Sequence, residues 1–478
     1  MSSKKIALMT WHHVRNYGTA LQAYALKTIL EKNGFLVDLI DYRREYSKPL
    51  KYKSLDKLFI GRLKFRGKKK KRVDFDNKLF EEFFNNYFSY TFSCRYSQDL
   101  NKLNELYDAF VCGSDQIWGP EWFNPVYFLD FVNNRNKLIA YAPSIGVEKI
   151  SDTGIFDNME KLIDRFPSVS VREESGCRII ENMGIASVYN VLDPVLLLTK
   201  KEWKEISKPI QKLPSKYAVV FFLKNNKRSI KKCINHLRNQ NVTPFVFHST
   251  QSEDNKYANF DGCSVEQILY LIEHAQAVYT DSFHITVLSL IFERQFTLFL
   301  KNKVNENNSK NSRLFDLLGK LDLIANIYDC SKCLDKKIDY SIIRKRIDDL
   351  RLSSYTYLEN ELTRALNSNK TIDENNSNTI CPYECEKCIG QTDKFFSEIK
   401  NPESFIAKRM VLWGFNLEEK CYGCKYLNRE KLFNSYRPLF YESLKKNFSE
   451  KKSLLYIYLK YYAAYDLPKI LNKKKNGK

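Results

Sequence analysis

The sequence lacks any apolar run of about 18 residues, so we expect no membrane-spanning helix. Its start, MSSKKIALMTW, has too short an apolar core for a signal peptide and leads directly into a strand pattern. Twelve cysteines without an export signal indicate a cytoplasmic protein whose thiols stay reduced or bind metal. Acidic residues are few: 56 Asp and Glu face 77 Lys and Arg, and the net charge of +21 favours anionic partners.

The composition is that of a globular protein, with 44% apolar and 14% aromatic residues. A length of 478 residues predicts two or three domains. The first forty residues predict a βαβ unit: strand 5–11, helix 19–33 and strand 35–42. Its first turn is not a GxGxxG fingerprint and gives no dinucleotide signal. A basic insertion, about 43–105, then interrupts the pattern, and its run Arg62–Arg72 is most simply a solvated loop.

Polar residues stand at the ends of several predicted strands. The strands 109–112 and 137–142 open onto the turns GSDQIWG and PSIG, and the strand 169–172 leads into a helix that begins at Glu173. Open α/β sheets bind ligands at the carboxyl ends of their strands, so we expect binding residues there. The candidates at these loops are Asn16, Asp115, Ser144 and Arg172, although each alone could be a turn or cap residue.

A second α/β series begins after Pro214, with strands 217–223 and 244–248 and helices 227–239 and 264–276. The fold class we predict is therefore α/β, with two facing Rossmann-like domains over residues 1–205 and 206–366. A ligand would lie in the cleft between two such domains. After a polar linker, residues 378–478 form a small Cys-rich module with a basic aromatic tail.

The stretch Tyr279–Leu290, YTDSFHITVLSL, joins a buried strand to an apolar helix. Asp281 and Ser282 form the turn, and Ser282 is placed to cap the helix. His284 then lies in the exposed first turn, where free backbone N–H groups and the helix dipole attract an anion. The alternative is that these three residues only cap and pack the helix. The basic residues that follow and could add charge to this site are Lys301, Lys303 and Arg313.

Seven ordered motifs over residues 5–325 together resemble the polysaccharide pyruvyl transferase family: NYGTALQAYAL, VCGSDQIW, AYAPSIG, SVREESG, LDPVLLL, TDSFHITVLSLIF and NSRLFDLL. The resemblance implies a GT-B-like fold and transfer of pyruvate from phosphoenolpyruvate to a sugar of a cell-surface polysaccharide or its precursor. The product is a cyclic ketal, and no metal or nucleotide cofactor takes part. By the same resemblance the catalytic residues are His284 and Arg172, and the substrate-binding residues are Asn16, Tyr17, Gly18, Gln22, Gly113, Ser114, Asp115, Ser144, Asp281, Ser282, Lys301, Lys303 and Arg313.

The sequence departs from the family pattern in the donor pocket. Some relatives carry arginine where Ser282 stands, and many have a small residue in place of Ile285. Arg313 is a candidate replacement for that arginine. Two other functions remain open: a nucleotide-sugar glycosyltransferase on the same fold, and a nucleic-acid-binding protein. The second is disfavoured because the basic residues are dispersed, so we expect no nucleic-acid partner.

The C-terminal cysteines form two Cys-x2-Cys pairs, Cys385/Cys388 and Cys421/Cys424, separated by 32 residues. This pattern predicts a structural zinc site with four thiolate ligands. An iron–sulfur cluster is the alternative, because Cys381 and the pair Cys330/Cys333 supply spare ligands; free thiols are the third explanation.

The tail segment Ser453–Leu471 predicts a helix rich in Tyr, Leu and Ile, followed by lysines. It either packs on the protein body or contacts the inner face of the plasma membrane. Membrane contact would suit a lipid-linked sugar acceptor.

Overall fold

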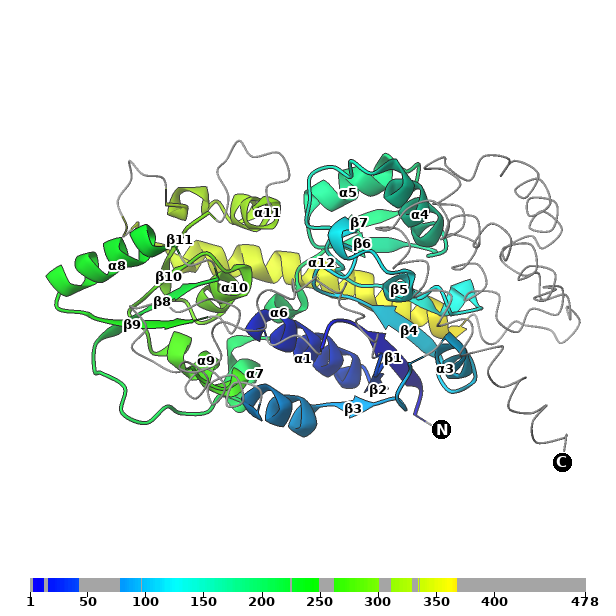
Figure 1. Ribbon diagram of the computed structural model, residues 1–478, viewed down its shortest axis with the longest axis horizontal. Coiled ribbons are helices and arrows are strands. Elements are labelled where there is room, and N and C mark those ends of the chain that lie inside the picture. The colour runs from blue at the N-terminus through cyan, green and yellow to red at the C-terminus, as the bar shows by residue number, and fades with distance from the viewer. Residues whose placement is uncertain are drawn as a thin grey trace, which may run out of the picture. The chain divides into compact units, whose positions relative to one another are not determined.

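The computed structural model describes residues 3–12, 16–42, 78–95, 97–223, 226–248, 262–300, 311–328, 334 and 336–367 (Figure 1). All of them belong to one compact unit, Met1–Ile372. Several predicted features lie outside the described residues: Arg62–Arg72, Lys301, Lys303, Cys330, Cys333, Cys381, Cys385, Cys388, Cys421, Cys424 and the tail Ser453–Leu471.

The first lobe, residues 3–205, is built on a parallel seven-stranded sheet in the order β3-β2-β1-β4-β5-β6-β7. This is the Rossmann order extended by one strand, and the order reverses between β1 and β4. There Ile6 of β1 pairs with Ala109 of β4. The strands are β1 Lys5–Met9, β2 Leu36–Leu39, β3 Ser89–Tyr90, β4 Ala109–Cys112, β5 Leu138–Ala140, β6 Val169–Val171 and β7 Val188–Asn190.

Helix α1, Tyr17–Lys32, is apolar around most of its circumference, as expected of a helix covered on all sides. It contacts α6 of its own lobe and both α9 and α10 of the second. Residues 78–87 are also helical. The other helices of this lobe are α3 Ser97–Lys102, α4 Thr153–Ile163, α5 Glu174–Glu181, α6 Pro194–Leu197 and α7 Lys200–Glu205, with 3-10 turns η2 Leu103–Glu105, η3 Pro120–Trp122, η4 Pro125–Phe128 and η5 Arg135–Lys137.

The second lobe, residues 217–328, has a parallel four-stranded sheet in the order β11-β10-β8-β9. Numbered within the lobe this is 2-1-3-4, the flavodoxin-like order, which reverses between β8 and β10. Its elements are β8 Tyr217–Phe222, α8 Lys227–Asn239, β9 Thr243–His248, α9 Val265–Glu273, β10 Ala277–Thr280, α10 Phe283–Ile291, β11 Gln295–Leu298, α11 Ser312–Lys320 and η6 Ile324–Asn326. The α/β class with parallel sheets is thus confirmed.

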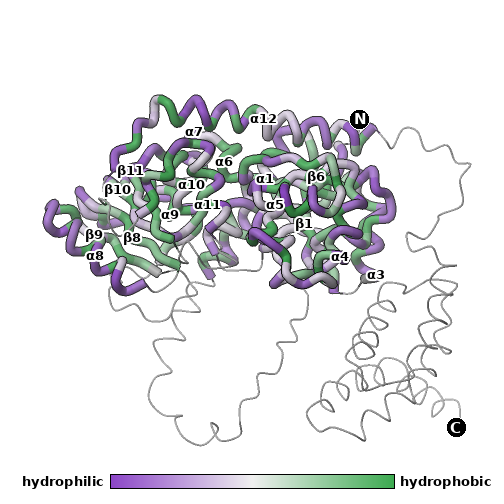
Figure 2. The backbone as a smooth tube through the Cα atoms, turned by 90° about the horizontal axis from the view of Figure 1, so that it is seen from above, coloured by the Kyte–Doolittle hydropathy of each residue, from purple (hydrophilic) through white to green (hydrophobic). Residues whose placement is uncertain are grey.

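A single apolar core joins the two lobes. It contains Leu21 and Leu26 of α1 together with Ile285 and Leu288 of α10. A second cluster fills the other face of the first sheet, where the Trp118 and Phe128 rings stack at 5.0 Å. Figure 2 shows hydrophobic stretches within both lobes and the mainly hydrophilic α8 at the edge of the second lobe. Because α1 and α10 share one core, their first turns lie close together, at Gly18 and His284.

Helix α12, Tyr340–Asn367, has no counterpart among the predicted elements. Near its start the Tyr340 hydroxyl donates to the Ser289 carbonyl of the second lobe at 3.3 Å. Near its end Arg364 Nη2 donates to the Leu138 carbonyl of the first lobe at 2.8 Å. The helix, yellow in Figure 1, therefore ties both lobes together. No helix of the described segments is long and apolar enough to cross a membrane.

Candidate active site

The points where strand order reverses in the two sheets face the same site. In the second lobe, Asp281 Oδ1 accepts a hydrogen bond from the Leu223 backbone N–H at 2.6 Å, which links the ends of β10 and β8. His284 is the second residue of α10. Its ring lies directly against α1 of the first lobe, as shown by Gly18: a Cβ added there would stand 1.9 Å from His284 Nδ1. Ligands of open α/β sheets bind at such positions.

Asp193 connects this histidine to the first lobe. Its Oδ2 lies 3.5 Å from His284 Nε2 and accepts a hydrogen bond from Arg172 Nη1 at 2.6 Å. Ser114 Oγ donates to the same oxygen at 3.3 Å. The other oxygen, Oδ1, accepts from the Val195 N–H and so caps α6. One buried carboxylate thus fixes the relative positions of a histidine and an arginine from different lobes.

Arg172 is surrounded by carboxylates. Besides its bond to Asp193, its Nη2 lies 3.5 Å from Asp115 Oδ1 and its Nε lies 3.8 Å from Glu173 Oε2. Burial alone would lower the pKa of Arg172, but these three carboxylates raise it above its usual value. The guanidinium is therefore charged and faces a carboxylate with Nη1, Nη2 and Nε, although Nε makes no hydrogen bond.

The carboxylates are held ionised by the same cluster. Burial would raise the pKa of Asp193, but the charges of His284 and Arg172 outweigh it and hold that pKa well below the usual range. Asp115 follows the same pattern: burial opposes its ionisation, Arg172 and His284 favour it, and its pKa is lowered. Two negative carboxylates beside Arg172 and His284 make a compact charged site with little access to water.

A network of hydrogen bonds shapes the loops around this cluster. Asn16 caps α1, accepting from the Gly18 N–H at 2.8 Å. Gln22 Oε1 accepts from the Ser114 N–H at 2.9 Å. Thr19 Oγ1 donates to Asp115 Oδ2 at 2.7 Å. These side chains position the backbone and the charged residues.

The loop after β5 is fixed in the same way. Ser144 Oγ donates to Glu173 Oε1 at 2.9 Å, and the Gly146 N–H donates to the same oxygen at 2.8 Å. Gly113 has φ 131°, and an added Cβ would stand 1.8 Å from the Tyr141 carbonyl oxygen. Only glycine fits there, because the chain folds tightly as it enters the Asp115 loop.

The model of the polysaccharide pyruvyl transferase family matches residues 16–300, more than half of the chain. The chain belongs to this family. The matched span holds all members of the buried cluster: Asp115, Arg172, Glu173, Asp193 and His284. Arg313 lies beyond it.

Among curated proteins none matches this pyruvyl transferase family member. Its structure is similar to UDP-N-acetylglucosamine 2-epimerase from Rickettsia bellii, at 12% identity and a TM-score of 0.41, with 77% of this chain and 99% of that chain covered. It is also similar to UDP-GlcNAc 2-epimerase from Neisseria meningitidis bound to UDP-GlcNAc, at 10% identity and a TM-score of 0.40, with 81% of this chain and 99% of that chain covered. A third similar structure is Arabidopsis thaliana UGT89C1 complexed with UDP-L-rhamnose, at 10% identity and a TM-score of 0.40, with 77% of this chain and 100% of that chain covered.

Two expectations need correction. Ser282 occupies the N-cap position of α10, but its side chain makes no capping bond; the Thr280 hydroxyl oxygen instead accepts the Ser282 N–H at 3.0 Å. His284 is buried, only 7% exposed, because α1 covers it. Tyr17, a predicted substrate-binding residue, lies in the contact between lobes, where its hydroxyl donates to the Cys263 carbonyl at 2.7 Å, and its role stays a prediction.

Two members of the cluster were missed from the sequence, Asp193 and Glu173. The Asp-Pro pair inside LDPVLLL was a signal for Asp193, since proline favours the first helical position after an aspartate cap. Glu173 follows Arg172 at the end of β6, where ligand-facing residues were already expected.

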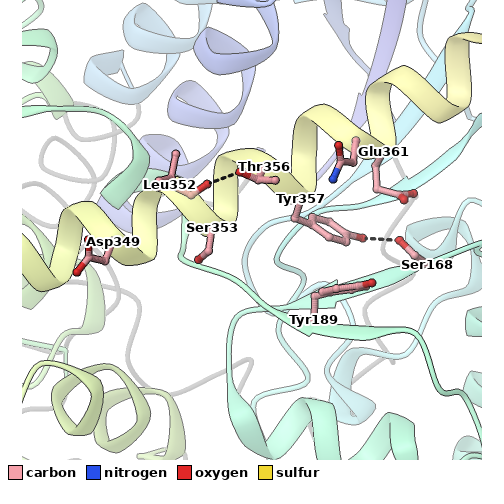
Figure 3. Close-up of a pocket in the computed structure, with 9 residues that line it drawn as sticks. Ser168, Tyr189, Asp349, Leu352, Ser353, Thr356, Tyr357 and Glu361 are labelled. Atoms are coloured by element: carbon pink, nitrogen blue, oxygen red, sulfur yellow. Dashed lines mark hydrogen bonds between the residues drawn. The ribbon is translucent and has the colours of Figure 1, made fainter.

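A separate hollow of about 620 Å³ lies between α12 and the first sheet (Figure 3). Ser168 Oγ donates to the Tyr357 hydroxyl at 3.2 Å, and the Tyr189 and Tyr357 rings lie 5.0 Å apart. None of the predicted site residues lines this hollow. Within the described part of the chain, no group of three or more His, Cys, Asp or Glu is placed to hold a metal ion.

Proposed function

We propose that this enzyme transfers pyruvate from phosphoenolpyruvate to a sugar of a cell-surface polysaccharide or its precursor. One observation carries the proposal beyond the family assignment: His284 of the second lobe meets the Arg172–Asp193 ion pair, which lies at the carboxyl ends of β6 and β7 of the first lobe. A histidine held between lobes is suited to act on a substrate that both lobes contact.

The reaction needs one proton delivered and one charge stabilised. Protonation of the methylene carbon of phosphoenolpyruvate creates an oxocarbenium-like centre, which a sugar hydroxyl attacks. Phosphate then leaves with the C–O bond electrons, and a second hydroxyl closes the ketal. Of the two protons that the sugar hydroxyls lose, one replaces the proton used to form the methyl group, and the other is taken up by the released phosphate. We assign proton delivery to His284, whose imidazolium Asp193 stabilises at 3.5 Å.

His12 is the alternative proton donor in the first lobe. It is buried, its Nδ1 lies 3.1 Å from the Thr10 carbonyl oxygen, and its ring contacts Tyr90 at 5.8 Å. His13, the other candidate, lies outside the described residues. We favour His284 because a carboxylate stands beside it and because it joins the lobes.

We also propose that the enzyme uses no catalytic cofactor. Its C-terminal cysteines, which lie outside the described residues, bind a structural zinc ion, with an iron–sulfur cluster as the alternative. Metal analysis of anaerobically purified protein that finds neither metal would remove the site.

We further propose a cytoplasmic enzyme that contacts the inner face of the plasma membrane to reach a lipid-linked acceptor. Equal binding to anionic vesicles by the full chain and by a chain ending at Lys452 would contradict a role for the tail.

A melting experiment separates the donor from the alternative of a nucleotide-sugar glycosyltransferase. A ligand that binds the folded state and not the unfolded state raises the melting temperature, and the rise grows with the ratio of its concentration to its dissociation constant. We expect phosphoenolpyruvate to raise it and a panel of nucleotide sugars to leave it unchanged. The reverse result would favour glycosyl transfer.

A further inference from the structure

Arg313 differs from Arg172 in its distance from the carboxylates. The charges of Glu173, Asp115 and Asp193 act on Arg313, but none of them forms an ion pair with it. Arg313 is 8% exposed, its Nε is buried without a hydrogen-bond partner, and it makes no ion pair or hydrogen bond with any described residue. Arg172, in contrast, faces a carboxylate with Nη1, Nη2 and Nε. A buried guanidinium that no carboxylate contacts directly is costly unless an anion completes it.

The surroundings of Arg313 hold it beside the proposed catalytic helix. Its guanidinium carbon lies 5.6 Å from the centre of the Phe283 ring, and that of Arg172 lies 5.0 Å from the same ring. Phe283 directly precedes His284, so Arg313 packs next to the residue assigned as proton donor. Burial and the charge of Arg172 lower the pKa of Arg313 to about 10, which leaves it charged at neutral pH.

The start of α11 adds further donors. Ser312 is the first residue of this nine-residue helix, and its buried Oγ has no hydrogen-bond partner. The Asn311 side chain occupies the N-cap position without capping the helix. A helix N-terminus, a serine hydroxyl and a guanidinium together form the set of donors that proteins use for phosphate.

We propose that Arg313, Ser312 and the first N–H groups of α11 bind the phosphate group of the donor. Arg172 has a different role: it is the ion-paired centre that fixes Asp193 and Asp115. This inference rests on the proposed function for the identity of the donor. It identifies a phosphate site outside the residues that the family model matches.

The test is calorimetric titration of the full chain with inorganic phosphate, which needs neither acceptor nor turnover. We expect Arg313→Gln to weaken phosphate binding at least tenfold and Ser312→Ala to weaken it several-fold. Lys320→Gln is the matched control, because it removes the same charge from the same helix, where Lys320 is paired with Asp316 at 3.2 Å. It should change the affinity less than twofold.

A second probe distinguishes phosphate from carboxylate. Pyruvate carries only the carboxylate, so its binding should not change in Arg313→Gln. If Arg313→Gln does not fold, Arg313→Lys is used in its place. Lysine keeps the positive charge but lacks the paired N–H donors of the guanidinium, so this variant should also weaken phosphate binding several-fold.

Wild-type affinity for phosphate in the arginine variants, or no phosphate binding by the wild-type chain, overturns the proposal. Phosphate binding that depends on Arg313 in a protein that transfers no pyruvate would refute the proposed function and support this site.

Discussion

Replacing Gly18 by alanine tests whether His284 acts from its packed position. The added Cβ would stand 1.9 Å from Nδ1, 2.5 Å from Cγ and 2.6 Å from Cε1 of the imidazole. Ordinary contact begins at 3.4 Å, so the ring must move by about 1.5 Å. Both helices are embedded in the shared core, and the imidazole is therefore the part that gives way.

The movement separates His284 from Asp193 without removing either. A misplacement of about 1 Å in a catalytic group can lower the rate about 100-fold, so we expect kcat to fall by at least about 100-fold. Global stability should change little, because alanine in place of a helical glycine gains about 1 kcal/mol and offsets part of the local clash. Phosphate release from phosphoenolpyruvate, measured with an acceptor pool that supports the wild type, reports kcat; thermal melting reports the fold.

Gly319→Ala is the matched control. It is also a helical glycine, but the nearest atom to its added Cβ is Ile324 Cδ1 at 4.0 Å. We expect normal turnover and equal or higher stability. If Gly18→Ala turns over at the wild-type rate with an intact fold, His284 does not act from the position described here.

Three further predictions concern the charged cluster. His284→Gln, which keeps most of the buried volume, should lower turnover by about 100-fold to 10,000-fold while the protein still melts cooperatively; normal turnover would move proton delivery to His12 or His13. Arg172→Lys should lose activity that raised phosphoenolpyruvate does not restore, since one ammonium group cannot pair with three carboxylates; rescue at high donor concentration would show a simple binding role instead. The lowered pKa values of Asp193 and Asp115 mean that their contribution to stability is present above their unfolded pKa of about 3.9 and is lost as pH falls below it. Asp193→Asn should therefore cost about 3–5 kcal/mol in the free energy of unfolding at pH 7, measured by urea titration, and flatten its acid dependence; an unchanged acid dependence would contradict the pairing.

The sequence predicted the parallel α/β architecture well, because each strand and helix carries a local pattern. The strand expected over 109–112 is β4, and the helix expected over 227–239 is α8. Residues at strand ends were also found, since topology brings the carboxyl ends of parallel strands to one edge. The structure brings Asp115, Arg172 and His284, each expected at a strand end, into one cluster, and their roles remain predictions.

Features that depend on contacts between lobes were not predictable from local pattern. Burial of His284 results from the approach of Gly18, some 266 positions earlier in the chain. Tyr17 reads as a loop residue, yet its hydroxyl bonds to Cys263 of the other lobe. Helix α12 has a mixed surface because it contacts elements of both lobes, so it has no single apolar stripe to detect.

The most direct test of the central claim is product analysis. The full chain would be incubated with phosphoenolpyruvate and a cell-extract pool of lipid-linked and nucleotide-linked sugars, and the sugars followed by mass spectrometry. We predict a sugar that gains the mass of one pyruvate less one water, with one phosphate released for each product. This gain should be absent with His284→Gln. Transfer of a sugar instead of pyruvate, or no pyruvylated product from any pool, would contradict the assignment of this enzyme as a pyruvyl transferase that uses phosphoenolpyruvate.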